Sequence, residues 1–203
     1  HLVHALRQMR SVTNLGDTPQ EHEMLYHINY GAPFLDNGSR LIAPFKQVAP
    51  RDPRSTEGME NFNKYGAPQA GFVEQAYFYD LAAKRGSRET AVMLRNAAGN
   101  QASVLRFSLK DFPYFTQWKN TASRADGYVT GLEPATSYPN ARRFEREKGR
   151  LIQLAGGESR TTSITIEALE TKKAIRTVEA EIRKLQNSVK GKVHPAPVGS
   201  FSG

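Results

Sequence analysis

Short segments in which apolar and polar residues alternate, separated by turn-forming Gly, Pro and Asn, dominate the first 170 residues. The clearest is RTTSITIEAL at 160–169, where Ile164 and Ile166 would share one face of a strand and Thr165 and Glu167 the other. Because side chains alternate between the two faces of a strand, this pattern predicts a sheet with one buried face.

Three further segments fit the same description. FVEQAYFYDL at 72–81 is rich in the aromatic and β-branched residues that strands favour. Residues 89–109 predict a hairpin that turns at 96–100, and DGYVTGLEP at 126–134 predicts a shorter strand. Several short strands at this spacing, with no helices alternating between them, predict an all-β fold class, an antiparallel β-sandwich or barrel.

Two segments break the pattern. Residues 43–70 are rich in Pro, Gly and polar side chains and predict a long irregular connection, a kind of loop that often forms the rim of a site. After Leu169 the apolar residues recur at helical spacing with charges between them: Ile175, Val178, Ile182, Leu185 and Val189.

This spacing predicts a basic amphipathic helix at 171–189. The helix either packs on the protein's own sheet, which is the favoured interpretation, or supports self-association by pairing with another chain. Residues 1–170 would then form the sandwich, and residues 190–203 would form a flexible tail.

The composition narrows the class of protein. Hydrophobic residues make up 38% of the 203 and charged residues 24%, which is typical of a soluble globular domain. No apolar run reaches the length of a membrane span, and the absence of cysteine excludes disulfides and thiolate chemistry. The chain begins at His1 and shows no signal peptide, so the natural chain can begin earlier, and the cytoplasm is only the favoured compartment.

The formal net charge of +8 is unevenly distributed. Residues 171–203 hold seven Lys or Arg against two Glu, which leaves a net charge of +3 for the first 170 residues. The body shows no basic patch with interleaved aromatic residues, so nucleic acid is disfavoured as a partner. The basic helix more often indicates a solvated face than a polyanion site.

One histidine stands out from the other four. His27 lies in LYHINYGAPFL at 25–35, an apolar and aromatic stretch that breaks into a Gly-Ala-Pro turn. It is either a half-buried residue hydrogen-bonded to the backbone or an acid–base group at the floor of a pocket. The residues alone favour the first alternative.

Two carboxylates and the single tryptophan are further candidates. Glu133, in VTGLEPAT, is expected to be partly buried, which would raise its pKa and suit it to base catalysis; the alternative is an ion pair with Arg142 or Arg143. Glu74 faces either solvent or a site, and Trp118, in PYFTQWKN, is typical of a sugar site or of a core. No metal site is expected, because no histidines have ligand spacing and no carboxylates form a calcium loop.

Six segments occur in a characteristic order: LYHINYGAPFLDNGSRLIAP, RD, FVEQAYFYDL, FPYFTQWKN, GYVTGLEPAT and GRLIQLAGGESRTTSITI. From about Ser11 to Leu169 they resemble the DUF4432 group of aldose 1-epimerase-like proteins, in the galactose mutarotase-like superfamily. The resemblance implies a large antiparallel β-sandwich and a monosaccharide or sugar derivative as the ligand. It also implies interconversion of sugar anomers without a cofactor or metal.

The resemblance assigns roles by position. His27, in HINYG, is similar to the histidine of the mutarotase HxYFN segment, which is the general acid, and Glu133 matches the late glutamate that is the general base. Glu74 falls where mutarotases carry an aspartate that binds sugar hydroxyls, although here Gln75 follows it in place of histidine. The other expected substrate-binding residues are Asn29, Gln117, Trp118 and Lys119.

The chain also departs from the superfamily pattern. Other members carry an upstream run of strands with a second sugar-binding histidine and an arginine, which this chain does not match. A fragment or a truncated sandwich with exposed sheet edges is therefore expected. The resemblance leaves two functions, an aldose 1-epimerase-like enzyme or a carbohydrate-binding protein without turnover. An interaction protein that docks through its basic helix ranks last.

Overall fold

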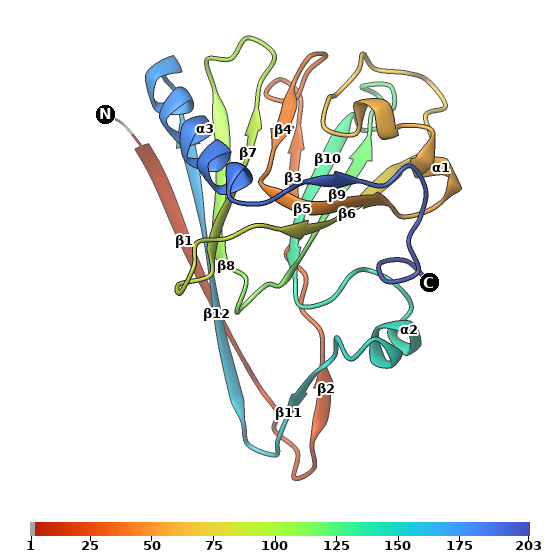
Figure 1. Cartoon of the computed structure of the whole chain (residues 1–203), viewed down its shortest axis with the longest axis vertical. Helices are drawn as coiled ribbons and strands as arrows, with labels where there is room; N and C mark the ends of the chain where they lie inside the picture. The colour runs from red at the N-terminus through yellow and green to blue at the C-terminus, as the bar shows by residue number, and fades with distance from the viewer. Residues whose placement is uncertain (1–2) are drawn as a thin grey trace.

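Two facing β-sheets build the core of the molecule, and a helix covers the outer side of one of them (Figure 1). The computed structural model describes residues 3–203. The five-stranded sheet contains, in spatial order, β1 (Val3–Thr13), β12 (Ser159–Leu169), β8 (Ala102–Ser108), β7 (Glu89–Arg95) and β4 (Arg40–Ile42). The six-stranded sheet contains β13 (Lys192–Val193), β5 (Phe45–Pro50), β6 (Gln75–Leu81), β9 (Tyr114–Asn120), β10 (Val129–Ala135) and β3 (Ile28–Gly31).

The strand pairs are antiparallel except for β13 with β5, so the predicted antiparallel β-sandwich is confirmed. Its core contains buried residues of both sheets, including Leu105 and Phe107 of β8 and Phe115 of β9. A small separate sheet pairs β2 (Gln20–His22) with β11 (Ile152–Leu154), and α2 (Arg142–Glu147) precedes β11.

The predicted alternation along β12 is present. Ile164 and Ile166 pair with Phe107 and Leu105 of β8, and both isoleucines belong to or pack against the core between the sheets. The predicted hairpin at 89–109 corresponds to β7 and β8. Its strand β7 is apolar on both faces because one face meets the core and the other meets a helix.

That helix is α3 (Lys172–Asn187), whose N-terminus is capped by Thr171 through a hydrogen bond from the backbone N–H of Ala174. Its buried residues Ile175, Val178 and Ile182 pack in one cluster with residues of β7 and β8. The helix therefore packs on its own sheet, as favoured from the sequence. Within residues 3–203, no helix combines the length and apolar character needed to cross a membrane.

The prediction of a long irregular connection at 43–70 is wrong for its first residues. Residues 45–50 form β5, because their backbone pairs with β6 despite the surrounding Pro and polar residues. Irregular chain, α1 (Pro53–Thr56) and the short 3₁₀ helix η1 (Met59–Asn61) follow. The strand predicted at 72–81 begins only at Gln75.

The structure also differs from the expected flexible tail at 190–203. Strand β13 pairs with β5, and Phe201, only 8% exposed, packs against Tyr138. The guanidinium of Arg150 binds both oxygens of buried Glu145 at 2.6 Å and donates to the backbone carbonyl of Ser200 at 2.6 Å. The Pro/Gly composition indicated disorder, but one aromatic side chain and this ion pair hold the segment.

Strand β1 forms one edge of the five-stranded sheet, where its described pairing is with β12 alone. The side chains of Leu6 and Met9 on it are 64% and 58% exposed. Within the described residues, β1 is therefore an exposed edge of this sheet.

Candidate active site

Three strands of the six-stranded sheet place candidate residues side by side. Gly131 of β10 lies opposite Asn29 of β3 and opposite Trp118 of β9, and Glu133 lies two residues further along β10. Directly opposed residues share a face, as do residues two apart in one strand. Asn29, Trp118 and Glu133 therefore lie on one face, opposite to that of Leu132, which is buried in the core.

His27 reaches the same face from the chain just before β3. The backbone N–H of Tyr26 donates to the carbonyl of Pro134 at 3.0 Å, which fixes this segment beside the end of β10. The imidazole Nε2 of His27 lies 3.1 Å from Oε1 of Glu133; the two side chains are 43% and 5% exposed. His27 is thus a partly exposed neighbour of a buried carboxylate, and its ring nitrogen contacts that carboxylate rather than the backbone.

Gly131 makes this contact possible. A Cβ atom added there would lie 2.6 Å from Cε1 of His27 and 2.9 Å from Oε1 of Glu133, distances at which one of the groups must move. A strand glycine often marks such a close approach. The sequence analysis did not single out Gly131, although its position within an otherwise good strand is the signal that could have found it.

The environment of Glu133 agrees with the expected buried carboxyl. Burial raises the pKa of Glu133 to about 7; the nearby charge of Arg51 opposes the rise, and that of Glu74 adds to it. The alternative ion pair is wrong, because Arg142 contacts Glu21 and Glu23, and Arg143 contacts Glu147.

A chain of polar contacts orients the tryptophan beside this pair. The Trp118 ring lies 5.7 Å from the His27 ring, centre to centre, and its Nε1 donates to Oε2 of Glu74 at 2.6 Å. The other oxygen of Glu74 accepts from Arg51 at 3.2 Å, and Arg51 also donates to Asp52 at 2.7 Å. Glu74 therefore faces the site rather than bulk solvent alone.

Asp52 connects this series of polar contacts to helix α1. Its carboxylate accepts from the backbone N–H of Ser55 at 2.7 Å and caps α1. The sequence analysis did not single out Arg51 as a site residue. The Asp-Pro pair that follows it, a helix-start signal directly after a strand, could have drawn attention to this position.

Gln117 and Lys119 do not join the site. Both belong to the opposite face of β9, because successive strand residues alternate. Gln117 is fully buried and donates to the backbone carbonyl of Phe62 at 3.1 Å and to the hydroxyl of Tyr65 at 2.9 Å. The expectation that three successive residues line one pocket is therefore wrong for two of them.

Several solved structures share this sandwich. A Klebsiella pneumoniae protein described as a "putative aldose 1-epimerase" is 30% identical to the chain with a TM-score of 0.91, and the match covers 96% of this chain and 50% of that one. A galactose mutarotase-like protein from Clostridium acetobutylicum is 18% identical with a TM-score of 0.56, over 81% of this chain and 52% of that one. A galactose mutarotase related enzyme from Lactobacillus acidophilus is 15% identical with a TM-score of 0.56, over 82% and 58%.

The chain thus spans between 50% and 58% of the length of these proteins. No curated protein matched the chain. The architecture places it in the galactose mutarotase-like class of β-sandwiches. Residues 4–168 match the family described as a domain of unknown function, DUF4432, and the chain belongs to that family.

Proposed function

We propose that this protein binds a monosaccharide on the outer face of its six-stranded sheet and interconverts the sugar's anomers, with Glu133 as general base and His27 as general acid. The observation that carries the proposal is the 3.1 Å separation of His27 Nε2 and Glu133 Oε1. The names of the similar structures, an aldose 1-epimerase candidate and galactose mutarotase relatives, support a sugar as the substrate class.

The separation suits the reaction because the two oxygens that exchange protons are attached to the same carbon. In an aldose ring, C1 bears both the anomeric hydroxyl and the ring oxygen. A base and an acid that serve these atoms must therefore be neighbours, each within hydrogen-bond reach of its own oxygen. His27 and Glu133 meet this requirement, and Gly131 leaves them the space.

The proton transfers balance without an external reagent. The Glu133 carboxylate removes the proton of the anomeric hydroxyl, and the electron pair of that O–H bond forms the C1 carbonyl. The bond between C1 and the ring oxygen breaks, and the ring oxygen takes the proton of protonated His27. Rotation about the C1–C2 bond presents the other carbonyl face, and the reverse transfers close the ring and restore both side chains.

The pKa of Glu133 fits this role. A general base works best when its pKa lies near the operating pH, since it is then both ionised and basic enough to accept the proton. Burial brings the pKa of Glu133 to about 7. The carboxylate form that the base step requires accordingly accumulates as the pH increases through 7.

Trp118 and Glu74 supply the groups that would bind the sugar. An aromatic ring packs on the apolar C–H face of a pyranose, and a carboxylate accepts hydrogen bonds from its hydroxyls. The side chain of Glu74 is 43% exposed, so its lone pairs remain accessible beside the Trp118 ring. Asn29 is exposed on the same face and adds an amide donor and acceptor.

The test is anomer exchange measured by polarimetry over a panel of aldoses. His27→Ala and Glu133→Gln should each lower the rate roughly 10²- to 10⁴-fold, the range for loss of one positioned proton transfer. His4→Ala and Glu170→Gln change the same residue types at exposed positions and should retain the wild-type rate. Wild-type rates in both site variants would dispose of the proposal.

Carbohydrate binding without turnover is the second candidate. The 43% exposure of the His27 side chain favours it, because water can hydrogen-bond to the imidazole in place of the ring oxygen of the sugar. Calorimetric binding of a monosaccharide by the wild-type chain, without acceleration of anomer exchange, would select this function over the enzymatic one.

A further inference from the structure

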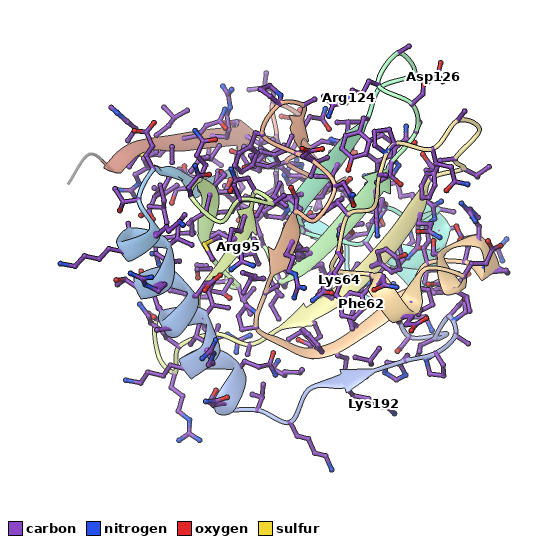
Figure 2. The ribbon with its side chains drawn as sticks, turned by 90° about the horizontal axis from the view of Figure 1, so that it is seen from above. Phe62, Lys64, Arg95, Arg124, Asp126 and Lys192 are labelled. Atoms are coloured by element: carbon purple, nitrogen blue, oxygen red, sulfur yellow. The ribbon has the colours of Figure 1, made fainter. Side chains whose placement is uncertain are left out.

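A cavity lies at the end of the sandwich where β9 ends. Its volume is about 630 Å³, and it is lined by residues of three segments, 37–40, 61–72 and 119–121. Cavities of roughly 300–1,000 Å³ are usual for small-molecule ligands. Figure 2 looks down on this end of the molecule and labels Lys64 in the second segment, with Arg124 and Asp126 on the loop after β9.

The cavity is separate from the candidate active site. Lys119, which lines it, follows Trp118 directly in β9, so the two side chains leave opposite faces of the sheet. His27 and Glu133 do not contribute to its walls.

The lining carries three cations and no carboxylate. The cations are Arg40, Lys64 and Lys119, and the polar groups beside them include the amides of Asn37 and Gln69. Asp36, which precedes the first segment, pairs with Arg124 at 3.3 Å and does not line the cavity. Among the described residues, none of the three cations forms an ion pair with a carboxylate.

Lys119 holds its charge in a buried position. The residue is 5% exposed, and its ammonium donates to the backbone carbonyls of Asn61, at 3.1 Å, and Lys64. It also lies 5.4 Å from the centre of the Tyr65 ring. Burial lowers the pKa of Lys119 to about 8, because the carbonyl dipoles and the ring only partly replace the lost hydration. An ammonium has three N–H donors, so one remains available.

Arg40 and Lys64 stand directly opposite each other. Their backbones form an antiparallel bridge, which brings the two side chains to the same side at close range. Like charges in this position repel and destabilise the pairing. Two exposed neighbouring cations and a buried third therefore line the same cavity, and an anion there would offset the repulsion between the first two.

We propose that this cavity binds a small metabolite through an oxyanion group, a phosphate or a carboxylate. Arg40 and Lys64 would hold the oxyanion by charge-assisted hydrogen bonds, with Lys119 at the base of the cavity. The amides of Asn37 and Gln69 would contact the neutral part of the ligand. This site lies beyond the proposed epimerase chemistry and does not depend on it.

The test is calorimetric titration of the full chain with inorganic phosphate, pyrophosphate and citrate, each at ionic strength held constant with sodium chloride. At least one probe should bind saturably at one site per chain. Arg40→Gln/Lys64→Gln should weaken that binding about tenfold or more, because each charge-assisted hydrogen bond is worth more than a neutral one. Both side chains are exposed, so the variant should fold.

The matched control is Lys172→Gln/Arg176→Gln, which removes the same charges from exposed positions of α3. It should bind the probe within about twofold of wild type, since charges farther away than a Debye length are screened. Pyrophosphate or phosphate binding without citrate binding assigns a phosphate ligand, and the reverse assigns a carboxylate. Absence of saturable binding for all three probes overturns the proposal, and so does an equal loss in the control.

Glu133→Gln separates this site from the proposed active site. The variant should bind the anion with wild-type affinity even though its anomer exchange is roughly 10²- to 10⁴-fold slower. A protein that shows no anomer exchange but binds pyrophosphate at this cavity would leave the anion site standing while the proposed function fails.

Discussion

The imidazole of His27 and the carboxylate of Glu133 meet at 3.1 Å beside Gly131, where the lack of a side chain leaves room for both. The backbone positions both residues. His27 is placed by the hydrogen bond from the N–H of Tyr26 to the carbonyl of Pro134, and Glu133 is placed by its position in β10. The pair is therefore sensitive to any side chain introduced at Gly131.

Gly131→Ala should inactivate the site while leaving the fold intact. The added Cβ would displace His27, and a shift of about 1 Å in a catalytic group can cost on the order of 10²-fold in rate. The anomerisation rate and the urea unfolding midpoint should be measured together. Gly199→Ala, where a Cβ meets open space, is the control and should match wild type in both. A fully active Gly131→Ala would show that the pair does not act in its observed geometry.

The pH dependence of stability should report the buried carboxyl of Glu133. Its pKa is about 7 in the folded protein, above the ordinary 4.5, so the folded state binds the proton more tightly than the unfolded state. The resulting stabilisation is complete below pH 4.5 and is lost as the pH rises through 7. Glu133→Gln cannot titrate and should gain stability relative to wild type over this range, by about 3 kcal/mol at most.

The measurement is urea unfolding of wild type and Glu133→Gln from pH 4 to pH 8. The exposed-site variant Glu170→Gln serves as the control, and its curve should run parallel to that of wild type. If the difference between Glu133→Gln and wild type stays constant across the range, Glu133 titrates as an ordinary carboxyl.

The hydrogen bond from Trp118 to Glu74 should contribute to sugar affinity. Trp118→Phe keeps an aromatic ring but removes the donor at 2.6 Å from Glu74. Hydrogen bonds to charged groups are worth roughly 1.5–3 kcal/mol, and exposure of Glu74 places this one near the lower limit. Monosaccharide binding followed by calorimetry should weaken about tenfold, with unfolding free energy changed by less than about 1 kcal/mol.

Glu74→Ala removes the acceptor of the same bond and should produce a loss at least as large, because Glu74 is also proposed to bind the sugar hydroxyls. Undiminished sugar affinity in Trp118→Phe would mean that the tryptophan ring is oriented by packing alone, and that Glu74 does not position it for a ligand.

Removal of one partner of the buried pair Arg150–Glu145 should destabilise the protein more than removal of one partner of a surface ion pair. Glu145 is fully buried and Arg150 is 8% exposed, so Arg150→Met would leave an uncompensated carboxylate. Loss of one partner of a buried pair costs about 3–5 kcal/mol. Arg143→Met removes a surface partner of Glu147 and should cost about 0.5 kcal/mol or less.

The same variant should loosen the C-terminal segment, since Arg150 also binds the carbonyl of Ser200. Hydrogen exchange of the Phe201 amide, which donates to Val198, should accelerate in Arg150→Met and remain unchanged in Arg143→Met. Equal stability of both variants would contradict the assigned role of the pair.

Much of the sandwich could be predicted because alternation is a local property. The hairpin at 89–109, the strand at 160–169 and the helix seam from Ile175 onward each follow from neighbouring residues. Strand β5 and the C-terminal segment could not be predicted in this way. Both have irregular composition, and both are held by partners far away along the chain, in β6 and around Tyr138.

The candidate site was predictable only in part. His27, Glu133, Glu74, Asn29 and Trp118 share one face in the structure, whereas Gln117 and Lys119 lie on the other. Strand alternation alone could have separated Trp118 from its two neighbours. The roles of Arg51 and Gly131 depend on contacts across several strands, which a single sequence does not contain.

One strand, β9, thus serves two compartments of the molecule, with Trp118 directed to one and Lys119 to the other. If β9 shifted its register by one residue against β6 or β10, every side chain of β9 would move to the other face. The Trp118 indole would then point inward and the Lys119 ammonium outward. Side-chain rotation could not repair this exchange. The two sites can therefore diverge residue by residue in evolution, yet a one-residue insertion or deletion within β9 itself would damage both at once.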